Sequence, residues 1–322
     1  NRLMIRPITG LLAPTAATAA VRASVSVPGY DPEHLADSWQ AANSPFLNRA
    51  LQAYAVGSVF KPVLAAAALE AGLQPVFECT GAVMVDGQIF RCAGGVPHGQ
   101  VDLAAALEKS CNGYFIRLGQ QLGAQALLQQ AQALGFGRSI GLAEGLTAQS
   151  GALPGAEELA QSGQLANFSF GQGSLLATPL QVAAMMNTIA NGGVYRAPCL
   201  LDCTLDETSG EELSAFARPQ AERVLTEQTA ATLHTMLEQT VAEGTAQDAS
   251  GLPGGAAGKT GTAQTGQFTA EGKERKNLWF AGFYPAEDPQ YTIVVLQDGQ
   301  TQAAVSSAAV FAQLCTALHW LG

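Results

Sequence analysis

Residues 54–72 are Tyr54-Ala-Val-Gly-Ser-Val-Phe-Lys-Pro-Val-Leu-Ala-Ala-Ala-Ala-Leu-Glu-Ala-Gly72, and they predict a turn followed by a helix. Gly57 gives the backbone freedom at the turn, and the run that follows is rich in Ala and Leu, which favour helices. Pro62 is tolerated only in the first turn of a helix, and Gly72 is typical of a helix end. The helix is therefore expected to begin close to Ser58.

Ser58 and Lys61 would lie on one face of this helix, so that the lysine amine can reach the serine hydroxyl. Both lie at the positive end of the helix dipole, which favours a developing negative charge and disfavours a protonated amine. A serine hydroxyl is a weak nucleophile until a base takes its proton, and a neutral lysine can be that base. The same pattern also fits a plain helix N-cap followed by a solvated lysine. Other motifs in the chain are needed to distinguish this structural interpretation from the catalytic one.

The composition is that of a globular chain, with 48% hydrophobic and 13% charged residues among 322. A net charge of −10 argues against a nucleic-acid or anionic-membrane surface. No run of about 18 apolar residues is present, so we expect no membrane-spanning segment. The chain begins at Asn1 without a signal peptide, and we expect a processed form whose anchor lies outside this sequence.

The cysteines show neither a C-x-x-C motif nor a regular Cys/His spacing, so the sequence predicts no structural zinc. A hairpin turn predicted at Asp86-Gly87 would put Cys79 opposite Gly94 and Cys92 opposite Gly81. The two thiols would then be diagonal neighbours, so a Cys79–Cys92 disulfide is compatible with the spacing but not required by it. The six cysteines are Cys79, Cys92, Cys111, Cys199, Cys203 and Cys315.

The period of the apolar residues changes along the chain. The middle is mainly helical, as in residues 178–191 and 226–243, each opened by a threonine N-cap. Residues 135–162 have no clear period and predict a Gly-rich connection. Alternating residues predict strands near both ends, over 3–7, 20–27, 259–265, 278–284 and 291–297, and a last helix over 303–321.

This order predicts an α+β fold, with an antiparallel sheet built from both termini, flanked by helices, and an inserted mainly helical lobe. We expect residues 1–74 and 226–322 to form a sheet-containing subdomain and residues 75–225 a mainly helical one. The active site would lie between them in one catalytic domain.

Three short motifs follow one another in the chain: Ser58-Val-Phe-Lys61, Ser110-Cys-Asn112 and Lys259-Thr-Gly261. The first opens a predicted helix, the second interrupts a helical region, and the third lies on a predicted strand. S-x-x-K, S-x-N and K-T-G in this order are the signature of penicillin-binding proteins and related serine β-lactamases. Each motif alone is weak, but the three together in these contexts are specific.

The chain resembles the transpeptidase domain of class B (monofunctional) penicillin-binding proteins over roughly residues 20 to 320. Val56 stands where that family usually has Pro, and residues 1–20 match poorly. The resemblance implies the fold shared by penicillin-binding proteins and serine β-lactamases. Further segments that match the family pattern are Pro28-Gly-Tyr-Asp-Pro32, Asn48-Arg-Ala50, His98-Gly99, Ser110-Cys-Asn-Gly-Tyr-Phe115, Gly171-Gln-Gly173, Thr178-Pro-Leu-Gln181 and Trp279-Phe-Ala-Gly-Phe283.

The resemblance also implies roles for residues at the motif positions. Ser58 would attack the penultimate D-Ala carbonyl of a stem peptide, with Lys61 as base and Ser110 as proton relay. Asn112 would hold the substrate amide or brace Lys61. Lys259 would supply positive charge, and the substrate carboxylate would bind Thr260, Gly261 and Thr262. The N–H groups of Ser58 and Thr262 would form the oxyanion hole. His98 is expected to be structural and Cys111 buried.

The expected function is a D,D-transpeptidase that crosslinks peptidoglycan, needs no metal or cofactor, and is acylated by β-lactams. A D,D-carboxypeptidase or β-lactamase on the same scaffold is the first alternative, and it needs a base for deacylation. Glu157 and Glu158 lie in the stretch where class A enzymes carry that base, but Ala160 follows Leu159 where an Asn is expected. A non-catalytic β-lactam sensor is the second alternative. The implied location is the extracytoplasmic face of the bacterial membrane, with a glycosyltransferase as partner.

Overall fold

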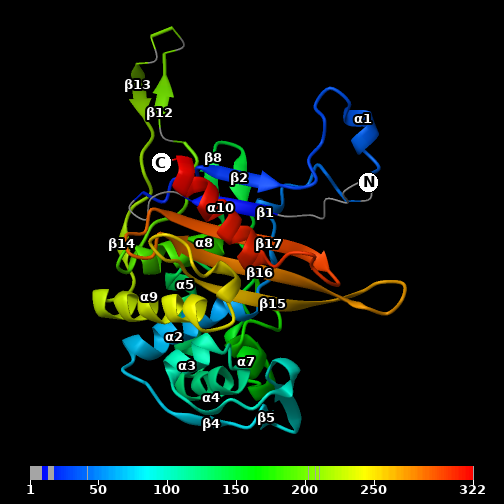
Figure 1. Ribbon diagram of the computed structural model, residues 1–322, viewed down its shortest axis with the longest axis vertical. Helices are drawn as coiled ribbons and strands as arrows, with labels where there is room; N and C mark the ends of the chain where they lie inside the picture. The colour runs from blue at the N-terminus through cyan, green and yellow to red at the C-terminus, as the bar shows by residue number, and fades with distance from the viewer. Residues whose placement is uncertain are drawn as a thin grey trace.

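The computed structural model describes residues 9–13, 18–41, 43–201, 203–206, 208–209 and 211–321. A five-stranded antiparallel sheet takes its strands from both ends of the chain, which confirms the predicted architecture (Figure 1). The strand predicted over 3–7 lies outside the described residues. In spatial order the strands are β15 (Ala257–Phe268), β16 (Glu274–Tyr284), β17 (Tyr291–Gln300), β1 (Thr9–Ala13) and β2 (Ala23–Ser26).

Side chains of β16 alternate between two cores, because successive residues of a strand point to opposite faces. Trp279 and Phe283 belong to the larger core, with residues of α8 (Pro179–Ala190) and α9 (Glu227–Ala242). Phe280 belongs to a second core, with Phe311 and Cys315 of α10 (Ser307–Leu321), which crosses the opposite face (Figure 1). The sheet is therefore covered by helices on both faces.

The helix predicted after Ser58 is α2 (Lys61–Glu70), and a single 3-10 turn, η2 (Gly57–Phe60), leads into it. Residues 61–68 are all buried, so α2 is a central helix rather than an amphipathic surface helix. It packs against α9 and against three helices of the middle of the chain: α3 (Leu103–Glu108), α4 (Asn112–Leu122) and α5 (Ala124–Ala133).

The predicted N-cap of α8 is confirmed as a capping box. Thr178 Oγ1 accepts the N–H of Gln181 (3.2 Å), and Gln181 Oε1 accepts the N–H of Thr178 (2.9 Å). The buried amide of Gln181 also donates to the backbone carbonyls of Gly135, Arg138 and Ser150. Gln181 therefore also fixes the segment that runs past the start of the helix.

That segment is more ordered than the sequence predicts, so the expectation of a Gly-rich connection over 135–162 is wrong in part. It holds a hairpin, β8 (Ile140–Ala143) with β9 (Leu146–Ala148), a short helix α6 (Ala156–Leu159), and the start of α7 (Ser162–Ser169). Elements of three or four residues carry too little periodicity to stand out in a sequence. Tertiary contacts such as those of Gln181 specify them instead.

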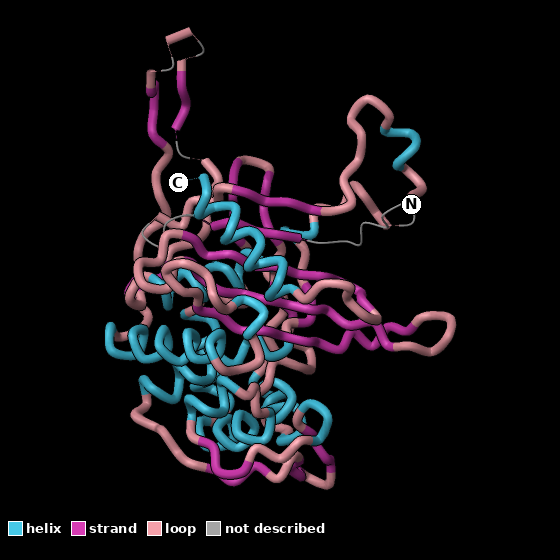
Figure 2. The backbone as a smooth tube through the Cα atoms, in the orientation of Figure 1, coloured by secondary structure: helices cyan, strands magenta, loops and turns pink. Residues whose placement is uncertain are grey.

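Short strand pairs and single helical turns make up the remaining elements, drawn in Figure 2 among the loops. They are α1 (Leu35–Ser38), η1 (Arg49–Leu51), β3 (Tyr54–Ala55) with β10 (Leu176–Ala177), β4 (Phe77–Cys79) with β7 (Gly99–Val101), β5 (Ala82–Val85) with β6 (Gln88–Arg91), η3 (Ala93–Gly95), β11 (Val194–Tyr195) with β14 (Glu222–Arg223), β12 (Cys203–Leu205) with β13 (Glu212–Ala215), and η4 (Gln247–Ala249).

The hairpin at Asp86-Gly87 is confirmed as β5–β6, and Cys92 lies opposite Gly81 as predicted, with its N–H donated to the Gly81 carbonyl (2.9 Å). The predicted partner of Cys79 is wrong. Cys79 belongs to β4, which leaves the hairpin and pairs with β7, so Cys79 lies opposite Gly99 rather than Gly94. The change of partner follows from Gly81, whose left-handed φ of 88° turns the chain between the two pairings.

The division into subdomains 1–74 with 226–322 and 75–225 stays a prediction. Helix α8 comes from the middle section and nevertheless packs on β16 and β17 of the sheet. Thr292 of β17 also donates a hydrogen bond to Asn187 of α8 (3.4 Å). Within the described part of the chain, no helix has the length and apolar character needed to cross a bilayer.

Candidate active site

The fold brings the three sequence motifs together. Ser58 lies in η2, Lys61 opens α2, and Ser110 and Asn112 lie at the break between α3 and α4. Lys259, Thr260, Gly261 and Thr262 follow one another on β15. Because β15 is the edge strand of the sheet, its outer side is free to lie against η2.

Two glycines allow this close approach of η2 and β15. A Cβ on Gly261 would lie 2.9 Å from Cγ1 and 3.0 Å from the backbone N of Val59, the residue after Ser58. Gly57 has a φ of 65°, and a Cβ there would lie 2.6 Å from the carbonyl oxygen of Thr262. The last residue of the K-T-G motif is therefore glycine because any side chain would push β15 away from the turn that carries Ser58.

A third glycine holds the turn from the other side. The N–H of Gly57 donates to the carbonyl of Gly171 (2.8 Å). Gly171 itself has a φ of 83°, and a Cβ on it would overlap the carbonyl of Gly57. The Gly171-Gln-Gly173 segment, which matches the family pattern, therefore contacts the backbone directly before Ser58.

Lys61 is the most constrained side chain of the site. It is fully buried, and its Nζ lies 2.7 Å from the Ser110 carbonyl oxygen, 3.0 Å from Ser110 Oγ and 2.7 Å from Asn112 Oδ1. Asn112 Nδ2 donates to the carbonyl of Arg91 (2.9 Å), which fixes the amide with its oxygen toward the lysine. Ser110 has a φ of 54°, an unusual conformation that turns both its carbonyl and its hydroxyl toward Lys61.

Burial lowers the pKa of the Lys61 amine to about 7, because a buried ammonium loses its hydration. The neighbouring thiols of Cys111 and Cys92 oppose this shift to a smaller extent. A substantial fraction of the amine is thus neutral near neutral pH. The side chain of Ser58 is only half-buried, so a nucleophile open to solvent stands one turn before a buried base.

Lys259 is also fully buried, and it lies beside two threonines. Its Nζ donates to Thr245 Oγ1 (3.3 Å) and to the carbonyl of Thr260 (3.4 Å), and the Thr260 hydroxyl donates to Thr245 Oγ1 (3.0 Å). Burial lowers the pKa of Lys259 well below its usual range, and the positive charge of Lys61 adds to this effect. Proton gain at one amine therefore disfavours proton gain at the other.

No sequence pattern singles out Thr245, which follows α9. Its N–H donates to the carbonyl of Glu108, near the end of α3 (3.1 Å). The preceding Gly244 lies so close that a Cβ would be 2.5 Å from the same carbonyl. Thr245 therefore connects the K-T-G strand to the S-x-N break. A lone threonine after a helix carries no sequence pattern that predicts such a contact.

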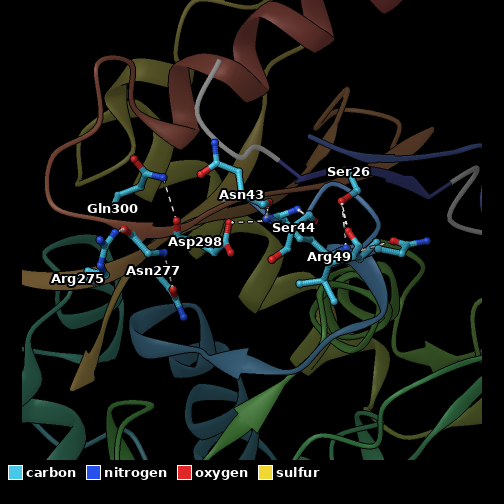
Figure 3. Close-up of polar contacts among 12 residues, drawn as sticks. Ser26, Asn43, Ser44, Arg49, Arg275, Asn277, Asp298 and Gln300 are labelled. Atoms are coloured by element: carbon cyan, nitrogen blue, oxygen red, sulfur yellow. Dashed lines mark hydrogen bonds and ion pairs between the residues drawn. The ribbon is translucent and has the colours of Figure 1, made fainter. Parts of the chain in front are cut away.

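A polar network joins the family segment at Arg49 to the sheet (Figure 3). The buried guanidinium of Arg49 pairs with Asp298 of β17 (Nε to Oδ1, 3.3 Å) and donates to the carbonyl of Asn43 (2.7 Å). Beside it, Asn277 Oδ1 accepts the N–H of Gly299 (3.2 Å), and Trp279 Nε1 donates to the carbonyl of Ala55 (2.9 Å). The segment that leads into Ser58 is thus tied to the sheet.

Comparison with known proteins agrees with this geometry. Residues 11–316 match the family described as the penicillin binding protein transpeptidase domain. The chain is 33% identical over 319 residues to Peptidoglycan D,D-transpeptidase PbpA of Mycolicibacterium smegmatis, covering 92% of this chain and 63% of that protein. It is 32% identical over 286 residues to Stage V sporulation protein D of Bacillus subtilis, covering 85% of this chain and 42% of that protein. The chain therefore spans less than two thirds of the length of these relatives.

Two solved structures resemble the fold closely. The D,D-transpeptidase domain of a peptidoglycan glycosyltransferase from Eggerthella lenta has a TM-score of 0.87 at 28% identity, over 99% of this chain and 79% of that one. The penicillin G acyl-enzyme complex of penicillin-binding protein A from M. tuberculosis has a TM-score of 0.83 at 28% identity, over 98% and 74%.

Proposed function

Because the chain belongs to the penicillin-binding protein transpeptidase domain family, we propose that it crosslinks peptidoglycan stem peptides as a serine D,D-transpeptidase. The observation that carries the proposal is the buried Lys61 amine, held by Ser110 and Asn112 one turn after Ser58. Support also comes from PbpA, which is named a D,D-transpeptidase, and from a similar structure that is an acyl-enzyme with penicillin G.

The contacts of Lys61 suit a neutral amine that acts as a base. A neutral amine has two N–H groups and one lone pair. The carbonyl of Ser110 and Oδ1 of Asn112 are acceptors only, so they take the two N–H groups, both at 2.7 Å. The lone pair is left for a hydroxyl proton, either that of Ser110 at 3.0 Å or that of Ser58 as it reacts.

The proposed reaction has two acyl transfers. Ser58 Oγ attacks the carbonyl carbon of the penultimate D-Ala, and its proton passes to Lys61. The C–N bond to the terminal D-Ala breaks, and Ser110 relays the proton from Lys61 to the leaving amine. An ester on Ser58 remains. The amine of a second stem peptide then attacks this ester, forms the crosslinking amide, and returns the hydroxyl to Ser58. The backbone N–H groups of Ser58 and Thr262 would stabilise the oxyanion in both steps.

The β15 residues would bind the substrate. The Thr260 hydroxyl is half-buried and the Thr262 side chain is exposed on the same strand, so both can meet the terminal carboxylate of the donor peptide. Gly261 allows the strand to approach η2, and Lys259 contributes positive charge below it. In the same proposal, β-lactams resemble the D-Ala-D-Ala end and acylate Ser58. The substrate lies outside the cytoplasmic membrane, so the domain would act there, with a glycosyltransferase supplying glycan strands.

The test is a stem-peptide assay that separates crosslinking from hydrolysis. The chain is incubated with a D-Ala-D-Ala stem peptide and a stem-peptide amine acceptor, and the products are identified by mass spectrometry. We expect D-Ala release together with a crosslinked dimer, and neither with Ser58→Ala. Ser209→Ala, in the exposed β12–β13 turn, is the matched control and should behave as the unmodified chain. D-Ala release without dimer would indicate a carboxypeptidase. Rapid nitrocefin turnover would indicate a β-lactamase, and acylation without either product a sensor.

A further inference from the structure

Three cysteines and a histidine gather directly behind the S-x-N motif. Cys79 ends β4, Cys92 follows β6, His98 precedes β7, and Cys111 lies between Ser110 and Asn112. The three cysteines are buried and His98 is half-buried. Their ligand atoms, three Sγ and one ring nitrogen, all lie within 4.8 Å of one another. The catalytic proposal uses none of these four side chains.

Three of the six distances between the ligand atoms are close to the edges of a tetrahedral zinc site. Cys79 Sγ lies 3.6 Å from Cys92 Sγ and 3.4 Å from His98 Nδ1, and Cys92 Sγ lies 3.8 Å from Cys111 Sγ. Zinc–sulfur bonds of about 2.3 Å and zinc–nitrogen bonds of about 2.05 Å in tetrahedral geometry place sulfurs roughly 3.8 Å apart and sulfur and nitrogen roughly 3.6 Å apart. These three distances agree with that geometry, and all four ligand atoms lie within 4.8 Å of one another.

The same distances do not fit a disulfide, because bonded sulfurs are about 2.05 Å apart. All six cysteines carry free thiols in the structure. Three buried thiols and an imidazole in contact with one another are a soft ligand set of the kind that selects zinc.

Glycines turn the backbone around the cluster of three cysteines and His98. Gly94 and Gly95 follow Cys92 with φ values of 64° and 68°, which folds the chain back so that His98 returns to Cys79. The N–H of His98 donates to the carbonyl of Cys79 (3.0 Å). At Gly81, a Cβ would overlap the carbonyl of Gly95, so this crossing requires glycine. The segments that carry Cys79, Cys92 and His98 thus lie against one another at positions that require glycine.

We propose that Cys79, Cys92, His98 and Cys111 bind one Zn²⁺ as a closed, four-ligand structural site. Binding releases three thiol protons and leaves a Zn(Cys)₃(His) group with a net charge of −1. With four protein ligands the metal has no open position for substrate, so its role is to hold the chain. The bound Zn²⁺ would fix the position of Cys111, and therefore also the Ser110 and Asn112 groups that contact Lys61. The sequence predicted no zinc site because the ligands come from four separate elements without a recognisable spacing.

The test measures metal content on the folded chain and does not depend on transpeptidase activity. The chain is purified under reducing conditions with Zn²⁺ present, desalted, and analysed by plasma mass spectrometry. We expect about one Zn²⁺ per chain. Replacement of Zn²⁺ by Co²⁺ should give the intense visible bands of a tetrahedral thiolate site.

Two variants and a control identify the ligands. Cys92→Ser and His98→Gln should each weaken Zn²⁺ binding by more than about 100-fold, because changes to residues that only hydrogen-bond a metal's ligands already cost up to that much. Cys203→Ser, a cysteine of the β12–β13 hairpin, should bind Zn²⁺ as before. If Cys92→Ser does not fold, His98→Gln and the Co²⁺ spectrum of the unmodified chain still decide. A chain without metal, whether its six thiols are all free or paired as a Cys79–Cys92 or Cys92–Cys111 disulfide, would overturn the proposal.

Discussion

Oδ1 of Asn112 lies 2.7 Å from Nζ of Lys61, and the other end of the same amide donates to the carbonyl of Arg91. Asn112 is therefore a fixed hydrogen-bond acceptor that orients Lys61. Both roles expected of Asn112, holding the substrate amide and bracing Lys61, depend on where its two amide groups point. In this structure the bracing role has direct contacts, and the substrate role stays a prediction.

The protonation of Lys61 predicts how acylation depends on pH. Below its pKa of about 7 the amine holds a proton and cannot take the one from Ser58. The rate of acylation by benzylpenicillin should therefore rise with pH through about 7 and then level off. Lys61→Arg, which stays protonated at every accessible pH, should lose at least about 100-fold in rate. A rate that falls across this range, or an active Lys61→Arg, would contradict the role of Lys61 as base.

Asn112→Asp should move that pH profile to higher pH. A carboxylate beside Lys61 favours the ammonium form and raises the pKa of the amine, by about 1 to 3 units for such a neighbour. The midpoint of the acylation rate should therefore shift upward by at least about one unit. Asn112→Ala removes the same contacts without adding charge, so it should slow acylation without this upward shift. Equal midpoints for the two variants would show that charge next to Lys61 does not control the reaction.

Gly171→Ala should damage the site, because the added Cβ would overlap the carbonyl of Gly57 directly before Ser58. Gly145→Ala is the matched control, with a φ of 74° and open space around the position of its Cβ. The control should cost about 1 kcal/mol of unfolding free energy from its left-handed backbone alone. Gly171→Ala should cost about 3 kcal/mol or more and also slow acylation. Urea unfolding of both variants measures the difference, and equal costs would argue against the predicted overlap.

The intact ion pair between Arg49 and Asp298 should add little net stability, but removal of one partner should destabilise the fold strongly. Arg49→Met leaves the Asp298 carboxylate without its cation, and should lower the free energy of unfolding by about 3 kcal/mol. Asp298→Asn in the same background should recover part of that loss, because the uncompensated charge is gone. A double-mutant cycle by urea unfolding gives the coupling energy. Additive effects would mean that the two side chains, 3.3 Å apart, do not stabilise each other.

The parts of the fold that depend on long runs of residues could be predicted from the sequence. Ala and Leu with Pro62 predict α2 to within a few residues, and the threonines at 178 and 226 cap α8 and α9 as expected. Strands β15, β16 and β17 follow from alternation over many residues. The three motifs lie at the start of a helix, at a break between two helices and on an edge strand. The local geometry of each place sets the direction of the motif side chains.

Contacts between segments far apart in the sequence could not be predicted in the same way. Thr245 reaches Lys259 only because α9 ends beside α3, and no local pattern marks it. The β8–β9 hairpin depends on the buried amide of Gln181, which belongs to a helix further along the chain. Cys79 pairs with β7 instead of extending the β5–β6 hairpin, and this change of partner assembles the thiol cluster.

Intact-mass spectrometry tests most directly whether Ser58 is the nucleophile of an acyl-enzyme. The unmodified chain and Ser58→Ala are incubated briefly with benzylpenicillin, and the mass of each is measured. We predict a stable adduct of one drug molecule on the unmodified chain and none on Ser58→Ala. An adduct of the same size on Ser58→Ala would contradict the assignment of Ser58, and an unmodified chain that neither forms an adduct nor consumes the drug would contradict the acyl-enzyme itself.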